Sequence, residues 1–386
     1  MVWHSIGPGE RNLFRLRLAV LLVVLTTGWI ESASQTNDCW NAFRGSQSLT
    51  GNSPVKLPAT LSLLWHFSTG DDVKSSPVVC SGKIVAGSTD GWVYCLDTNG
   101  RLLWKFNSGN AIEAPALILD NLIFIGNMDG VFYCIDLNSG LKKWEYKTDG
   151  QIIGSANWWK EGKVTKILFG SYDYFLHCVD GATGVGLWKY ESDNYINGAA
   201  ACVAGKAYFG GCDGFLHVVD IKTGKADKKI ELGTYVAGSV AIEGTKSWIG
   251  DYDGEFMEVD LVSGKKVMTW KDEKTGLPFI ASPSVSGNNV LTANHNKFTY
   301  CFEKSSGKLK WTFNTGNRVE ASPVIAGDKV LIANMRGDVT LLSLNDGKKI
   351  WTYELGGSVV SNPAVAGGRF IVGNTDGNIY CFGKQL

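Results

Sequence analysis

Five histidines are the side chains in this sequence best suited to metal binding or acid–base chemistry, because imidazole titrates near neutral pH and ligates zinc. They are His4, His66, His177, His217 and His295. No pair of histidines or cysteines has the spacing of a zinc site. His177 and His217 occupy a position of a repeated pattern where other copies carry tyrosine: Tyr94, Tyr133, Tyr300 and Tyr380. We therefore interpret both as aromatic-sized fillers of one slot, and predict no metal site and no catalytic residue.

Aspartates recur at another position of the same pattern, and most of them precede glycine. They are Asp90, Asp129, Asp173, Asp213, Asp253 and Asp376. Turn chemistry explains them, because an Asp side chain accepts hydrogen bonds from nearby backbone while glycine adopts the left-handed conformation. The pattern breaks at Asn296-Lys297 and at Arg336-Gly337. Such breaks fit either a specialised surface or sequence drift.

The nine cysteines are also explained mainly by repetition. Five share one position of the pattern: Cys95, Cys134, Cys178, Cys301 and Cys381. Each of the five therefore falls in a different structural unit, out of reach of disulfide geometry with the others. We predict that they are small buried apolar side chains.

These recurring positions belong to one unit written eight times with a period near 40 residues, the first copy running from Ser75 to Gly109. Period-two apolar patterning between glycine-bearing turns predicts antiparallel hairpins. A tryptophan closes most units: Trp65, Trp104, Trp144, Trp188, Trp270, Trp311 and Trp351, with Ile230 standing in once. We predict an all-β, eight-bladed β-propeller of four-stranded antiparallel blades.

The two ends of the array complement one another. The eighth unit stops at Leu386 after its third strand, while residues 61–67, LSLLWHF, form an outer strand with no unit of their own. We predict that this N-terminal strand completes the last blade and closes the ring, which removes exposed sheet edges.

Composition and the N-terminus bear on partners and location. The chain has 37 basic and 37 acidic side chains, a balance that argues against nucleic acid as a partner. Arg11, Arg15 and Arg17 precede an apolar run at 18–29 and small residues at 32–34, the pattern of a signal peptide. We expect a signal peptide at 1–34, a lead-in at 35–60 and the propeller at 61–386. Cleavage near Ser34 would leave no membrane span in a periplasmic or secreted protein, and the alternative is a retained N-terminal anchor.

The motif Asp136-x-x-Ser139-Gly140-x-x-x-Trp144, repeated from Asp180 to Trp188, resembles the tryptophan-docking repeat of PQQ-like propellers. The resemblance implies that each closing tryptophan packs against the neighbouring blade. The fourth and fifth units depart from this motif, because we read each as carrying two extra residues before the tryptophan position. Residues 40–45, WNAFRG, resemble a lead-in of exported bacterial members of this family.

This family includes both enzymes and scaffolds, so the resemblance specifies a fold better than a function. Quinoprotein alcohol dehydrogenases use the repeat, and so does the propeller component of the outer-membrane barrel-assembly machinery. The dehydrogenases resemble one another in having adjacent cysteines over the quinone, and no two cysteines are adjacent here. We expect a noncatalytic protein without a cofactor. The alternative is a PQQ-dependent dehydrogenase-like protein or one that binds a quinone or another small ligand.

Binding residues are expected on the rim, where the loop from each outer strand leads into the next innermost strand. The polar residues at this place are Lys74, Glu113, Asn197, Arg318 and Glu320, among apolar equivalents Ile153, Val236 and Ile280. Trp158 and Trp159 form either an exposed anchor or part of the core. We expect a monomer that binds a protein or peptide in the cell envelope, and carbohydrate binding is a further alternative.

Overall fold

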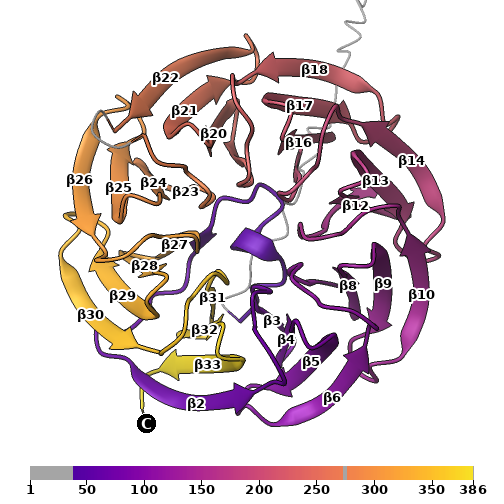
Figure 1. Ribbon diagram of the computed structural model, residues 1–386, viewed down its shortest axis with the longest axis horizontal. Helices are drawn as coiled ribbons and strands as arrows, with labels where there is room; N and C mark the ends of the chain where they lie inside the picture. The colour runs from indigo at the N-terminus through magenta and orange to yellow at the C-terminus, as the bar shows by residue number, and fades with distance from the viewer. Residues whose placement is uncertain (1–37, 273–275, 386) are drawn as a thin grey trace, which may run out of the picture. The chain divides into compact units, whose positions relative to one another are not determined.

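The computed structural model describes residues 38–272 and 276–385, all within the unit Gln35–Leu386. These residues form eight β-sheets arranged as blades around a central axis (Figure 1). The predicted all-β propeller with four-stranded antiparallel blades is therefore confirmed. The predicted signal segment at 1–34 lies outside the described residues. Within the described ranges, no helix has the length and apolar character needed to cross a membrane.

Blades 1 to 4 follow one another along the chain, each from its innermost to its outer strand. Blade 1 contains β3 (Val78–Cys80), β4 (Lys83–Gly87), β5 (Trp92–Asp97) and β6 (Leu102–Asn107). Blade 2 contains β7 (Leu117–Leu119), β8 (Leu122–Gly126), β9 (Val131–Asp136) and β10 (Lys142–Lys147). Blade 3 contains β11 (Asn157–Glu161), β12 (Val164–Gly170), β13 (Phe175–Asp180) and β14 (Gly186–Glu191). Blade 4 contains β15 (Ala201–Val203), β16 (Lys206–Gly210), β17 (Phe215–Asp220) and β18 (Ala226–Glu231).

Blades 5 to 8 complete the ring. Blade 5 contains β19 (Ala241–Glu243), β20 (Lys246–Gly250), β21 (Glu255–Asp260) and β22 (Lys265–Lys271). Blade 6 contains β23 (Ser284–Ser286), β24 (Asn289–Ala293), β25 (Phe298–Glu303) and β26 (Leu309–Asn314). Blade 7 contains β27 (Val324–Ala326), β28 (Lys329–Ala333), β29 (Asp338–Ser343) and β30 (Lys349–Glu354), extended by β1 (Asn52–Ser53). Blade 8 contains β31 (Ala364–Ala366), β32 (Arg369–Gly373), β33 (Asn378–Gly383) and β2 (Ser62–Ser68).

Blade 8 is closed by the N-terminal strand, as the sequence predicted. Strand β2 pairs antiparallel with β33, and Trp65 lies opposite Cys381. In Figure 1 the indigo β2 lies beside the yellow β33, at opposite ends of the chain. The ring is thus held shut without a covalent link between its first and last strands.

The lead-in crosses the axis and contacts the innermost strands in turn. Trp40 forms a β-bridge with Val79 in blade 1, and β1 pairs in parallel with β27 in blade 7. Between them, lead-in carbonyls accept hydrogen bonds from these amides of blades 2, 4, 5 and 6: Ile118, Cys202, Ile242 and Val285. The short helix η1 (Phe43–Gly45) therefore sits near the centre of the ring (Figure 1).

Two further contacts fix this lead-in. The guanidinium of buried Arg44 donates hydrogen bonds to Pro283 O at 2.9 Å and Ser284 Oγ at 2.6 Å, and burial lowers the pKa of Arg44 to about 9. Cys39 forms a disulfide with Cys80 of β3. This disulfide was not predicted from the sequence, because Cys39 lies before the first repeat and Cys80 lies outside the shared cysteine position. The five cysteines at that position are free and buried, as predicted.

Tryptophan docking holds neighbouring blades together. The indole Nε1–H of Trp104 donates a hydrogen bond to Leu137 O in the next blade at 3.1 Å. Its ring leaves no room for a side chain at Gly140, where an added Cβ would lie 2.7 Å from the indole. The same indole-to-carbonyl bond is made by Trp65, Trp144, Trp188 and Trp311. Trp351 instead packs on Phe382 of blade 8, with ring centroids 5.5 Å apart.

The structure corrects the docking residues of blades 4 and 5. Lys228 lies opposite Val218, and Met268 lies opposite Glu258, which is the register that places Trp188 opposite Cys178. Lys228 Nζ also donates to Leu261 O at 2.9 Å, in place of an indole N–H. The blades therefore carry no two-residue insertion before the docking position. Ile230 and Trp270 instead occupy the slot that Tyr190 fills in blade 3.

Candidate functional site

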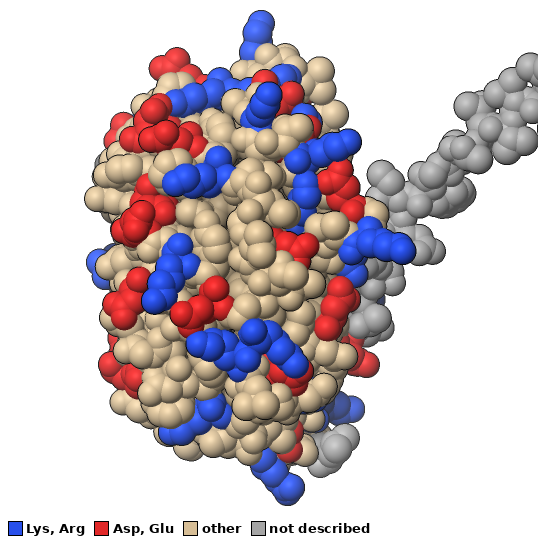
Figure 2. Space-filling view, turned by 90° about the vertical axis from the view of Figure 1, so that its right-hand side faces the viewer, with Lys and Arg blue, Asp and Glu red and all other residues tan. Residues whose placement is uncertain are grey.

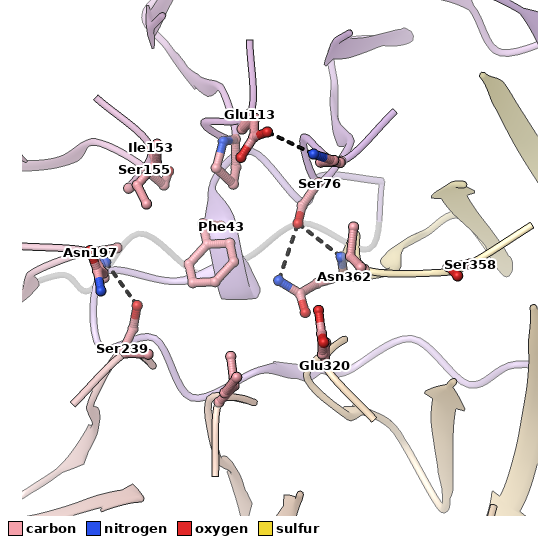
Figure 3. A pocket seen from close by; sticks show the side chains of 18 of the residues that line it. Phe43, Ser76, Glu113, Ile153, Ser155, Asn197, Ser239, Glu320, Ser358 and Asn362 are labelled. Carbon is pink, nitrogen blue, oxygen red and sulfur yellow. Dashed lines mark hydrogen bonds and ion pairs between the residues drawn. The ribbon is translucent and has the colours of Figure 1, made fainter. Parts of the chain in front are cut away.

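A funnel opens on the axis at one end of the ring, which we call the funnel face. This end carries the Asp-Gly turns and the loops that join each outer strand to the next blade. The funnel has a volume of about 520 Å³, and its wall includes residues from every blade. Phe43 of η1 lies in its centre, so the lead-in forms the floor (Figure 3). The volume is within the range of ligand pockets in proteins.

The funnel brings together four of the five predicted rim residues: Lys74, Glu113, Asn197 and Glu320. The predicted apolar equivalents Ile153 and Ile280 also line it. Val236 does not, because it is fully buried and its neighbour Ala237 takes the lining position. Arg318 lies outside the lining, with its Nε 3.5 Å from Glu320 Oε1.

The charged rim residues are paired with each other. Lys74 Nζ donates a hydrogen bond to Glu113 Oε1 at 2.9 Å, and this bond raises the pKa of Lys74 (Figure 3). His295 Nε2 lies 3.4 Å from Glu320 Oε1, and this interaction is the main cause that lowers the pKa of Glu320. The rim is therefore a mixed-charge ring whose opposite charges lie against one another.

A belt of hydroxyl groups below the rim makes the wall of the funnel rigid. The amide of Ala199 donates to Ser239 Oγ at 2.8 Å, and the amide of Ser239 donates to Ser282 Oγ at 2.9 Å. Equivalent bonds continue through Ser322 and Asn362, whose amide donates to Ser76 Oγ (Figure 3). Each bond crosses between neighbouring blades, so the wall is preorganised.

Trp158 and Trp159 do not belong to the funnel. Both lie on β11 and are half-buried, and they pack against the buried clusters of neighbouring blades. The carbonyl of Trp158 also accepts a hydrogen bond from Gln47 Nε2 of the lead-in at 2.6 Å. Of the two interpretations offered by the sequence, the packing therefore favours a place in the core.

His177 and His217 are held inside their blades, as the sequence predicted. His217 is fully buried and stacks on Phe209, with ring centroids 4.7 Å apart. Its Nε2 lies 2.9 Å from Asp213 Oδ2, and its Nδ1 lies 3.1 Å from the Tyr190 hydroxyl. Both ring nitrogens are thus used within the fold. Within the described ranges, no group of three or more His, Cys, Asp and Glu residues could hold a metal ion.

A set of tyrosines at the mouth of the funnel was not predicted from the sequence. Tyr172 stacks on Tyr195 with ring centroids 4.6 Å apart, and Tyr235 lies 4.3 Å from Tyr252. Burial is the main cause that raises the pKa of Tyr172. Their signal was in the loops rather than the strands: Tyr195 and Tyr235 fill one loop position in consecutive units, and Tyr172 and Tyr252 fill one turn position in units 3 and 5.

The comparisons with known proteins agree with this geometry. A family model described as outer membrane protein assembly factor BamB matches residues 58–161, 89–313 and 299–384. The chain belongs to the BamB family. No curated protein matched the chain in sequence.

Solved structures with the same fold as this BamB-family propeller include a BamB protein and dehydrogenases. BamB from Moraxella catarrhalis is 19% identical with a TM-score of 0.72, covering 84% of this chain and 98% of that one. A europium-containing methanol dehydrogenase is 13% identical with a TM-score of 0.75, covering 91% and 99%. The quinohemoprotein alcohol dehydrogenase from Comamonas testosteroni is 14% identical with a TM-score of 0.76, covering 92% and 82%. At these identities the likeness shows the fold alone.

The funnel of this BamB-family member does not fit the quinone of such dehydrogenases. Pyrroloquinoline quinone carries several carboxylates, which need cationic partners when they leave water. The cation in the lining is Lys74, and it is already paired with Glu113. Glu320 adds a further negative charge to the wall. The described residues of the funnel would therefore repel the cofactor.

Proposed function

We propose that this chain is a noncatalytic scaffold that binds a protein or peptide of the cell envelope at its funnel face. The observation that carries the proposal is the variation of one ring of positions. Most of the repeat is used for blade pairing, docking and turns, and is similar from blade to blade. The rim position instead differs in charge and size in consecutive blades: Lys74, Glu113, Ile153, Asn197, Ala237, Ile280, Glu320 and Val360. Positions free of structural duty are where binding specificity can be encoded.

The family and the N-terminal pattern support a location in the cell envelope. We propose a signal peptide at 1–34, a lead-in at 35–60 and the propeller at 61–386, in a periplasmic or secreted monomer without a membrane span after cleavage. A retained N-terminal anchor is the alternative. The outer wall of the ring carries acidic and basic side chains interspersed (Figure 2), which gives no continuous basic surface for nucleic acid there.

Site-specific photo-crosslinking in the native host tests the binding face. A photoreactive amino acid replaces Arg318 at the rim, whose side chain is 54% exposed. The control positions are Leu103 on the outer strand β6 and Asp328 at the opposite end of the ring, which are both exposed. We expect one partner crosslinked from position 318 and from neither control. Crosslinks from the control positions alone would contradict the proposal.

The second candidate is a protein that holds a quinone or another small ligand on the axis. It is favoured by the volume of the funnel, about 520 Å³, and opposed by the charges of the funnel wall. Titration of the full chain with pyrroloquinoline quinone and Ca²⁺ separates the two. The scaffold proposal predicts no change in quinone absorbance and no shift in melting temperature, and saturable changes in both would favour the second candidate.

A further inference from the structure

The mouth of the funnel carries an unusual concentration of exposed aromatic side chains in blades 3 to 5. We call this set the tyrosine arc, and its members are Tyr172, Tyr174, Tyr195, Tyr235 and Tyr252. Tyr174, Tyr195 and Tyr235 are more than two-fifths exposed. The arc is anchored from below, because the amide of Tyr252 donates to Tyr235 O and the amide of Cys212 donates to Tyr195 O. Exposed, rigidly held aromatic side chains are typical of interaction surfaces.

One member of the arc occupies a backbone position that disfavours it. Tyr174 has a φ of 75°, in the left-handed region, at the turn position where most other blades carry glycine. These glycines are Gly91, Gly130, Gly214, Gly254, Gly337 and Gly377. A bulky side chain in this conformation costs free energy that glycine would not. The Tyr174 side chain is exposed and packs against Tyr195, with ring centroids 5.1 Å apart. It therefore contributes to the arc rather than to the core.

The charges on the funnel face are segregated although the whole chain is neutral. On the described loops and turns of this face, aspartates gather in blades 1 to 5 and 8: Asp71, Asp72, Asp90, Asp129, Asp149, Asp173, Asp193, Asp213, Asp251, Asp253, Asp272 and Asp376. The cations of the corresponding loops are Lys74, Lys297, Arg318 and Arg336. Three of these four lie in blades 6 and 7, so the sector that carries the tyrosine arc is acidic.

Some of these carboxylates are already neutralised, and others are not. Lys229 pairs with Asp193 and also lies 3.5 Å from Asp213. Asp149 and Asp253 flank the arc and, among the described residues, have no ion-pair partner. Beside the arc, these two carboxylates are available to a ligand.

Tyrosine faces beside unpaired carboxylates match the chemistry of arginine. A guanidinium stacks on an aromatic ring and forms bidentate hydrogen bonds with a carboxylate, which a compact ammonium does less well. The chain already stacks cations on rings at the edge of this face. Lys189 Nζ lies 4.1 Å from the centroid of Phe175, and Lys229 Nζ lies 4.2 Å from that of Phe215.

We propose that the tyrosine arc, with Asp149 and Asp253, binds an arginine-containing segment of a protein. This inference rests on the proposed function, because it names the chemistry of the partner that the funnel face holds. A polyanion is disfavoured by the acidic sector. A neutral glycan could stack on tyrosine but would gain nothing from the two carboxylates.

The test uses three fluorescent peptides of equal length and the full chain. Arginine alternates with serine in the first peptide, glutamine replaces arginine in the second, and glutamate replaces it in the third. Fluorescence anisotropy should show binding of the arginine peptide, at least about tenfold weaker binding of the glutamine peptide, and none of the glutamate peptide. Rising salt should weaken the arginine complex, because exposed charges are screened.

Two pairs of variants separate the arc from general charge attraction. Tyr174→Gly should weaken the arginine complex by about threefold to tenfold while raising the melting temperature. Lys297→Gly, which relieves the same backbone conformation in blade 6, should also raise the melting temperature but leave binding unchanged or slightly tighter. Asp253→Asn should weaken binding, whereas Asp328→Asn at the opposite end of the ring should not.

Equal affinity for the arginine and glutamine peptides would overturn the inference, as would unchanged binding in Tyr174→Gly and Asp253→Asn. If the partner is still crosslinked from position 318 in that case, the proposed function stands and only the partner chemistry is wrong. If the preference for arginine and the crosslink from position 318 are both absent, the partner chemistry and the proposed function are both wrong.

Discussion

Weakening the contacts of strand β2, which closes blade 8, should destabilise the whole ring. We consider Trp65→Ala, because Trp65 is on β2 and docks onto blade 1. The substitution removes a hydrogen bond from Nε1 to Thr98 O at 3.1 Å, whose net value is about 1 kcal/mol. It also removes a half-buried indole that covers Gly100, which adds about 2 kcal/mol. We therefore expect the free energy of unfolding to fall by about 3 kcal/mol.

Deletion of residues 61–67 should have a larger effect than Trp65→Ala. Blade 8 then loses its fourth strand, and β33 presents an unpaired edge. In a ring each blade depends on its neighbours, so the damage should spread beyond blade 8. The measurement is urea denaturation followed by tryptophan fluorescence, together with hydrogen exchange of the β33 amides. The control is Leu63→Ala, because Leu63 is on the same strand but is exposed.

For a domain of this size, a loss of about 3 kcal/mol corresponds to a fall in melting temperature of roughly 3–6 °C. A deletion variant that melts within about 1–2 °C of the parent would show that β2 is not needed for closure. Unchanged exchange of the β33 amides would lead to the same conclusion.

Three further predictions concern other parts of the chain. Cys39→Ser should lower the free energy of unfolding by about 2–4 kcal/mol, since the disulfide with Cys80 closes a separation of 41 residues, and an unchanged urea midpoint would refute this. For Asp213, burial favours a higher pKa, but the hydrogen bond and charge of His217 outweigh it and lower the pKa below its ordinary value. The ionised carboxylate therefore stabilises the fold above about pH 4, and this contribution is lost as the pH falls through the folded pKa. Asp213→Asn should be less stable than the parent at pH 7, with a difference that shrinks below about pH 4 in urea midpoints, and a constant difference would contradict the sign. Mass spectrometry of the native protein should find an N-terminus near Ser34, whereas an intact Met1 in a cytosolic fraction would refute export.

The architecture was predictable because the same pattern of structurally required residues recurs eight times along the chain. Glycine at turns such as Gly140, histidine in a tyrosine slot at His217, and a displaced outer strand at 61–67 each follow from local rules. The docking residues of blades 4 and 5 were not predictable from residue type. The register of β18 and β22 places Lys228 and Met268 at the docking position, although the sequence offers Ile230 and Trp270 two residues later. The register of backbone pairing, rather than residue type, therefore determines which residue lies at the docking position.

The site was predictable only in part, because it is formed by loops and by the lead-in. Four rim residues were identified from their variation between repeats. In the fifth blade the alignment was wrong by one residue, because Val236 is buried and Ala237 lines the funnel instead. The disulfide depends on the path of the lead-in across the axis, which no repeat encodes. The acidic sector was hidden by a net charge of zero over the whole chain.

The proposed function depends most directly on the charges of the rim. Lys74→Glu places a carboxylate beside Glu113, and Glu320→Lys places an ammonium beside His295. Each reversal replaces a partly exposed ion pair, so the cost in stability should stay below about 1 kcal/mol. The decisive measurement is the yield of the partner crosslinked from position 318 in the doubly reversed protein. We predict that the crosslink from position 318 disappears while the melting temperature stays close to that of the parent. An undiminished crosslink from position 318 would show that the rim does not hold the partner, and the account would be wrong.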